Sequence, residues 1–91
     1  MKGIYRFKCD CGRMGELSGI FVADSEDIKR LIGSYAYFGE VLGKHSEVCG
    51  KIEKNEIELI ADDAKCVEMF EFFNLETGYN PFSYLAEEGN E

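Results

Sequence analysis

The sequence lacks long apolar runs, has a single histidine and a single proline, and carries almost no positive charge in residues 55–91. No uncharged apolar run is much longer than residues 19–23, whereas a membrane-spanning helix needs about 20 apolar residues. The first eight residues alternate charged and apolar side chains, unlike the continuous apolar segment of a secretory signal. We therefore expect a cytoplasmic protein with no membrane partner, whose four cysteines stay reduced.

Negative charge is concentrated in the last 37 residues. The 91-residue chain has a formal charge of −8. Residues 55–91 contain one lysine and ten acids, a net charge of −9, whereas residues 1–54 contain nine cations and eight acids, a net charge of +1. An acidic surface repels a nucleic-acid backbone. Duplex nucleic acid is therefore excluded as a partner, while a small anion bound by the N-terminal part remains compatible with the sequence.

Alternation and capping signals predict one small α+β domain over residues 1–91, with a frayed tail at 87–91. Polar and apolar residues alternate in five segments, which predicts a mainly antiparallel sheet of about five strands: residues 3–9, 17–23, 35–42, 47–54 and 57–60. Two or three short helices are expected on one face of this sheet. They are predicted to begin after Asp24, after Asp63 and at Pro81, which follows Asn80.

Apolar side chains recur at helical spacing after Asp63. Cys66, Met69, Phe70 and Phe73 stand at i, i+3, i+4 and i+7, a pattern typical of a helix face that packs on the core. We expect this stripe to be buried. Three later aromatic residues are expected in the core or an interface: Tyr79, Phe82 and Tyr84.

The strongest candidate site is a polar break between the third and fourth predicted strands, formed by Gly43, Lys44, His45, Ser46 and Glu47. Glycines let a backbone approach a ligand closely, and consecutive N–H groups can point at an anion. A lysine is a compact donor to phosphate, and a serine hydroxyl can donate or accept. These residue types favour a cradle for a small anionic ligand. The alternative is a plain polar hairpin loop with a solvated lysine and histidine.

Neighbouring residues extend this candidate site toward a nucleotide. Glu40 or Glu47 can accept two donors from a base edge, and Tyr35, Tyr37 or Phe38 can stack on a base. Arg13, at the tip of the first predicted hairpin, is a second candidate for contact with an anion across a subunit interface. The ligand-binding residues predicted from the sequence are therefore Arg13, Tyr37, Glu40, Gly43, Lys44, His45, Ser46 and Glu47.

Catalysis and metal binding are less well supported. Adjacent side chains of an extended segment point to opposite faces, so His45, Ser46 and Glu47 cannot form a hydrogen-bonded relay. Cys9 and Cys11 are separated by a single residue, and Cys49 and Cys66 are isolated, which does not match a zinc knuckle. We expect no enzymatic activity, no catalytic residues, no metal and no cofactor.

Three segments, residues 15–23, 39–47 and 78–85, together resemble the phage-encoded anti-CBASS nucleotide-sponge proteins. That resemblance implies a homo-oligomer, a dimer or tetramer, that sequesters a cyclic dinucleotide immune signal such as cyclic GMP-AMP without cleaving it. It also implies action in the cytoplasm of a host cell. The resemblance assigns no role to any single residue.

Two other functions remain open on the sequence alone. Residues 55–91 are acidic enough to imitate a nucleic-acid backbone and to inhibit a partner protein by occupying its basic groove. Alternatively, His45 acting as a general base would make the protein a small hydrolase.

Overall fold

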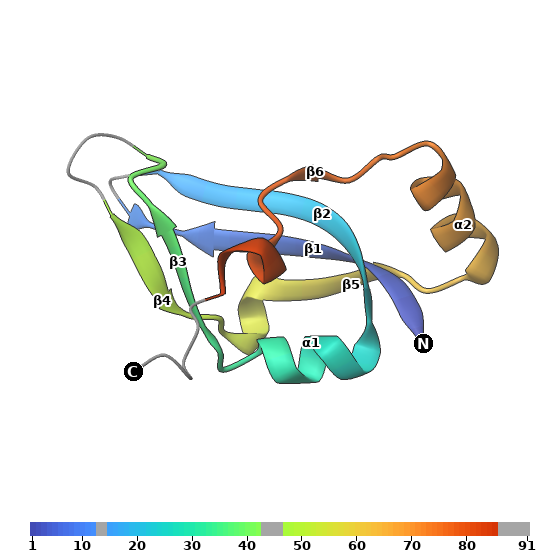
Figure 1. Ribbon diagram of the computed structural model, residues 1–91, viewed down its shortest axis with the longest axis horizontal. Helices are drawn as coiled ribbons and strands as arrows, with labels where there is room; N and C mark the ends of the chain where they lie inside the picture. The colour runs from blue at the N-terminus through green and yellow to red at the C-terminus, as the bar shows by residue number, and fades with distance from the viewer. Residues whose placement is uncertain (13–14, 43–46, 86–91) are drawn as a thin grey trace.

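The computed structural model describes residues 1–12, 15–42 and 47–85 (Figure 1). The strands are β1 (Lys2–Asp10), β2 (Glu16–Asp24), β3 (Tyr35–Gly39), β4 (Val48–Lys51), β5 (Ile57–Ala61) and β6 (Thr77–Gly78). The helices are α1 (Ser25–Leu31) and α2 (Ala64–Phe72), with 3-10 turns at Lys54–Glu56 and Pro81–Tyr84. All strand pairs are antiparallel, which confirms the predicted α+β class.

The strands are divided between two sheets. One sheet has the order β5-β1-β2-β6, and the second consists of β3 and β4. The β1–β2 hairpin runs in unbroken register from the pair Lys2 and Asp24 to the pair Asp10 and Glu16, which confirms the first predicted hairpin. Strands β3 and β4 are shorter than predicted. Strand β3 ends at Gly39, where the chain turns with a φ of +80°, and β4 ends at Lys51.

Aromatic rings join the two sheets into one core. Phe7 of β1 and Phe21 of β2 are fully buried. The ring of Phe7 stacks on that of Phe38 from β3 with centroids 5.7 Å apart, and Phe21 meets Phe82 edge to face at 5.8 Å. Tyr79, Phe82 and Tyr84 pack against this core, as predicted. The C-terminal segment is therefore attached to the body by its aromatic side chains.

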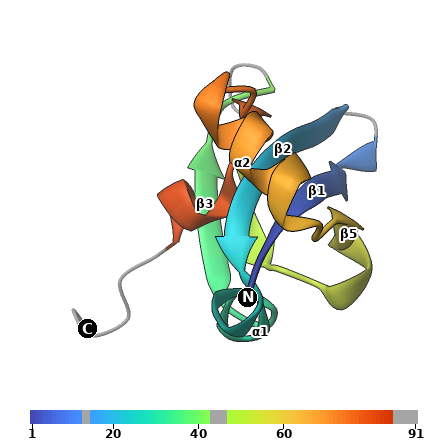
Figure 2. The ribbon, with the colours of Figure 1, turned by 90° about the vertical axis from the view of Figure 1, so that its right-hand side faces the viewer.

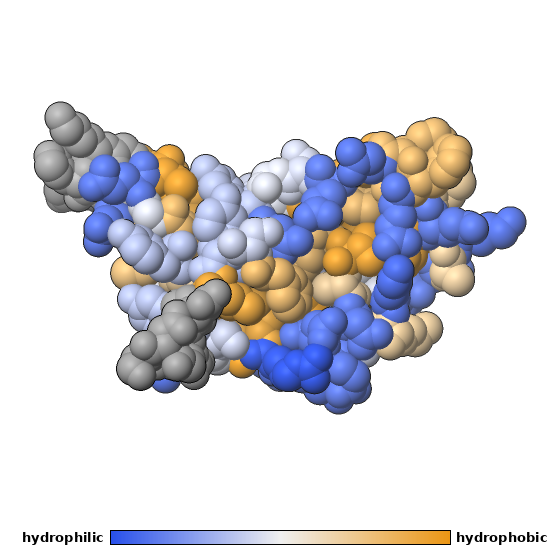
Figure 3. Space-filling view, viewed as in Figure 1, coloured by the Kyte–Doolittle hydropathy of each residue, from blue (hydrophilic) through white to orange (hydrophobic). Residues whose placement is uncertain are grey.

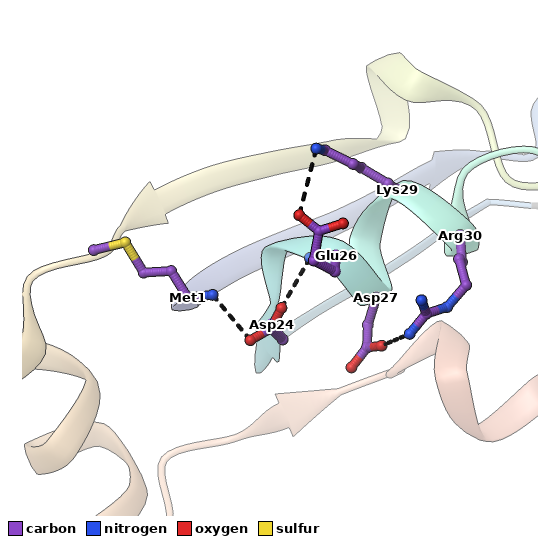
Figure 4. A network of polar contacts seen from close by, with 6 residues as sticks. All are labelled: Met1, Asp24, Glu26, Asp27, Lys29 and Arg30. Carbon is purple, nitrogen blue, oxygen red and sulfur yellow. Dashed lines mark hydrogen bonds and ion pairs between the residues drawn. The ribbon is translucent and has the colours of Figure 1, made fainter.

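Helix α1 begins at the predicted N-cap (Figure 4). The Asp24 carboxylate accepts a hydrogen bond from the backbone N–H of Glu26 at 2.9 Å, and it also pairs with the amino group of Met1 at 2.9 Å. Acids in the first turn and bases in the last turn suit the helix dipole. They also form the pairs Glu26–Lys29 and Asp27–Arg30. Helix α2 likewise begins at the predicted cap, where Asp63 accepts from the N–H of Cys66.

The prediction that the α2 stripe is core was wrong. Within α2 only Val67 is buried. Of the predicted stripe, Phe70 is half-buried, whereas Cys66 is exposed, Met69 is 53% exposed and Phe73, at the C-cap, is 55% exposed. The helix lies at the end of the four-stranded sheet, away from β3 and β4 (Figures 1 and 2). No element of the described chain covers its outer side, so periodicity indicated an apolar face that the fold leaves uncovered.

In the described part of the chain, no helix is long and apolar enough to cross a bilayer.

Glycines permit the close contact between β2 and the C-terminal segment. Gly19 pairs with Gly78, and the N–H of Tyr79 donates to the carbonyl of Ser18 at 2.9 Å. A Cβ atom on Gly19 would clash with the backbone of Tyr79, and one on Gly78 would clash with the backbone of Ser18. Backbone atoms cannot rotate away as a flexible side chain can.

We predict that Gly19→Ala lowers the free energy of unfolding by about 2–3 kcal/mol, because two backbones must separate. Gly12→Ala is the matched control. Its φ is +66°, and none of the described residues lies within 4 Å of an added Cβ, so only the strain of a left-handed residue, about 1 kcal/mol, is expected. Urea unfolding of both variants measures the difference. Equal losses would contradict the close contact.

Candidate functional site

The structure describes three of the eight predicted site residues. Tyr37 lies in β3, Glu40 is exposed in the bend that follows it, and Glu47 immediately precedes β4. The other five predicted residues lie outside the described residues: Arg13, Gly43, Lys44, His45 and Ser46. The cradle predicted at residues 43–47 is therefore not described by the structure, apart from Glu47.

The hairpin brings two predicted residues into contact. The phenol of Tyr37 donates a hydrogen bond to Oε2 of Glu47 at 2.9 Å. The contact follows from strand alternation. Ala36 and Phe38 point into the core, so Tyr37 and its neighbour Tyr35 must point outward, where they are 48% and 45% exposed.

Strand pairing adds two residues of β4 to this surface. Tyr35 lies opposite Lys51, and Tyr37 lies opposite Cys49. We call the exposed side of this strand pair the tyrosine face, and its members are Tyr35, Tyr37, Glu47, Cys49 and Lys51. The predicted site omitted Lys51. Residues 47, 49 and 51 alternate along the fourth predicted strand and therefore share one face of it. This alternation is the sequence signal that would have identified Lys51 as part of the site.

The rings of the two tyrosines on this face differ from those of the other described tyrosines in their surroundings. Tyr5, Tyr79 and Tyr84 each contact another aromatic ring in or beside the core. Within residues 1–12, 15–42 and 47–85, Tyr35 and Tyr37 take part in no such ring contact. Both rings are therefore open to stacking with a flat ligand.

Carboxylates and a thiol set the protonation of these phenols. The hydrogen bond to Glu47 and its negative charge raise the pKa of Tyr37, and Glu40 adds to the effect. The thiol of Cys49, which lies opposite Tyr37 on the neighbouring strand, is the main reason that the pKa of Tyr35 is raised. Both hydroxyls therefore stay protonated at neutral pH and can donate hydrogen bonds. Lys51 supplies the positive charge of the face.

A pair of cysteines lies at the end of β1. The sulfur atoms of Cys9 and Cys11 are 3.9 Å apart. Burial raises the pKa of Cys9 to about 12, helped by the charge of Glu56 and by Cys11. Cys49 and Cys66 are exposed elsewhere. Among the residues that the structure describes, no three Cys, His, Asp or Glu side chains gather in a group suited to a metal ion.

A separate groove of about 390 Å³ crosses the side of the four-stranded sheet that faces away from the core. Arg6 and Lys8 line it, together with Ser18 and Thr77. Both cations already pair with acids, Arg6 with Glu58 at 3.1 Å and Lys8 with Glu16 at 3.6 Å. These pairs reduce the attraction of the groove for an anion, so the tyrosine face is the stronger candidate.

Comparison of the chain with protein-family models, with curated proteins and with solved structures finds no match. Any assignment of function therefore has to be argued from the residues of the site itself.

We predict that the half-buried thiol of Cys9 reacts more slowly than the exposed thiols of Cys49 and Cys66. A pKa of about 12 leaves little thiolate in mildly alkaline solution. Alkylation followed by mass spectrometry should modify Cys49 and Cys66 at least about tenfold faster than Cys9. Because burial is the largest cause of the raised pKa, Glu56→Gln should accelerate Cys9 only slightly. Reaction of all three thiols at one rate would refute the assignment.

We also predict that Glu47→Gln lowers the pKa of Tyr37, because a neutral amide no longer opposes formation of the phenolate. In the native protein the raised pKa means that this contact contributes stability below the pKa of an unfolded tyrosine. The contribution is lost as the pH rises through the folded pKa. NMR titration of ring-labelled tyrosine measures the shift. Glu68→Gln, on α2, is the control and should leave the Tyr37 titration unchanged.

Proposed function

We propose that the protein binds a small anionic nucleotide on the tyrosine face and holds it without chemical change. The observation that carries this proposal is the pair of exposed tyrosines, which lie on one strand face and take part in no ring contact within the described chain. Stacking on an aromatic side chain contributes about 1–3 kcal/mol per base and tolerates any base. A nucleotide supplies both the flat rings and the negative charge that such a face can bind.

The spacing of the tyrosines suits bases. Side chains two residues apart on a strand are separated by about 6.8 Å, roughly twice the distance between stacked bases. If the planes of both rings are perpendicular to the strand direction, the gap between them is wide enough to hold one base. Lys51 lies opposite Tyr35 in the strand pair, and its positive charge supports a role in contacting a phosphate. Glu40 and Glu47 then remain to accept hydrogen bonds from a base edge.

The resemblance to phage sponge proteins, which remains a prediction, points to cyclic dinucleotides such as cyclic GMP-AMP as the ligand class. An open strand face covers only one side of a flat ligand. A second copy of the chain placed over the same face would cover the other side, so a homo-oligomer, a dimer or tetramer, is part of the proposal. The alternative of a small hydrolase rests on His45, which lies outside the described residues.

The proposal is tested by calorimetric titration with cyclic GMP-AMP, cyclic di-AMP, cyclic di-GMP, AMP and GMP. We expect one or more cyclic dinucleotides to bind, to saturate at a fixed number of molecules per subunit and to be recovered intact by chromatography. Tyr37→Ser should weaken that binding by about 5- to 150-fold, the equivalent of one lost stacking contact. Lys51→Gln should weaken it and reduce its dependence on salt.

Phe72→Ser provides a matched control, because Phe72 is an exposed aromatic residue on α2. Its substitution should leave nucleotide binding unchanged. The proposal is wrong if none of the five compounds binds, if Tyr37→Ser binds as tightly as the native protein, or if a cleaved product accumulates with time.

A further inference from the structure

Helix α2 and the residues that follow it carry the most exposed apolar surface of the described chain. Met69, Phe72, Phe73 and Leu75 are all more than half exposed, and Phe72 and Phe73 pack edge to face with centroids 5.1 Å apart. We call these four residues the α2 patch. Figure 3 shows apolar side chains gathered over this end of the molecule, with hydrophilic side chains beside them.

The exposure follows from the width of the apolar arc of α2. At 100° per residue, Val67 and Phe70 lie on the side that meets the body, and they are buried and half-buried. Met69 and Phe73 lie further around the helix, on the side that faces away. On the opposite flank, Glu71 accepts a hydrogen bond from Lys2 of β1 at 3.1 Å. This contact and the burial of Val67 both agree with an orientation of α2 in which the α2 patch faces away from the rest of the molecule.

The patch is large enough to form the centre of an interface. Four side chains of this size, each more than half exposed, present on the order of 400 Å² of apolar surface. A typical interface buries about 800 Å² on each partner, somewhat more than half of it apolar. An apolar patch of this size on a single chain often marks a site of interaction.

Charge decides which kind of partner fits. Several acids on and beside α2 have no ion-pair partner among the described residues, and they are Asp62, Asp63, Glu68 and Glu76. The helix itself carries one cation, Lys65. A second copy of the chain would bring a surface of the same negative charge to this end of the molecule, and like-charge contacts are unfavourable. A surface rimmed by lysine and arginine would instead be attracted.

We propose that the α2 patch docks a partner protein through a basic amphipathic helix, whose apolar stripe is flanked by lysine or arginine. The apolar side chains of the patch are buried in the complex. The nearby acids orient the approaching partner and speed its association. This inference goes beyond nucleotide binding. Helix α2 and the β3–β4 pair lie at opposite ends of the long axis of the molecule (Figure 1), so both surfaces can be occupied at once.

The test uses three synthetic peptides in place of the partner surface. The first is an amphipathic helix with a leucine stripe and lysines elsewhere, the second has glutamates in place of the lysines, and the third is a scrambled form of the first. We expect the first peptide to bind at least tenfold more tightly than the other two. Met69→Gln and Phe73→Gln, which keep good helix formers at exposed positions, should each weaken its binding at least fivefold.

Tyr37→Ser is the matched control, since it removes an exposed aromatic ring at the other end of the molecule. It should leave peptide binding unchanged, while both α2 variants should leave nucleotide binding unchanged, so the two proposals fail separately. Circular dichroism confirms that the variants are folded. Equal binding of the scrambled or glutamate peptide would overturn the inference. So would self-association of the native protein that Phe73→Gln abolishes, because the occupant would then be a second copy.

Discussion

The stacked rings of Phe7 and Phe38 join the four-stranded sheet to the β3–β4 pair, and the position of the tyrosine face depends on this contact. Once Phe38 is anchored inward, strand alternation leaves Tyr35 and Tyr37 no orientation except outward. A shift of β3 by one residue would exchange the two sets and place phenols in the core. The core therefore fixes which side of this hairpin can meet a ligand.

The limited core of the described chain explains why the α2 patch and the tyrosine face both remain uncovered. The core is built around β1, β2, α1 and β3–β4, and a chain of this length buries a smaller share of its surface than a large domain does. Helix α2 packs at the end of the sheet with Val67 as its only buried residue. The apolar side chains of this helix span a wider arc than the rest of the described chain can cover. The limited core is therefore the common reason that one face of α2 and one face of the β3–β4 pair are uncovered.

Local signals in the sequence predicted the local structure well. Asp24 and Asp63 cap the two helices because capping depends on residues only two or three positions apart. The division of the strands into two sheets depends on pairing between distant segments, which alternation does not encode. Periodicity found the apolar stripe of α2 but carries no information on whether another element covers it. Likewise the contact between Tyr37 and Glu47 needed the register of β3 on β4, which only the folded chain supplies.

The two proposed surfaces share no residue, and the rigid aromatic core lies between them. Coupling between two sites requires at least two arrangements of the structure that the ligands bind with different affinity. Closely packed interiors resist such rearrangement. Nucleotide bound at the tyrosine face should therefore leave the affinity of the α2 patch unchanged. If both proposals hold, a partner bound at α2 changes where the protein carries its nucleotide and leaves the affinity for that nucleotide unchanged.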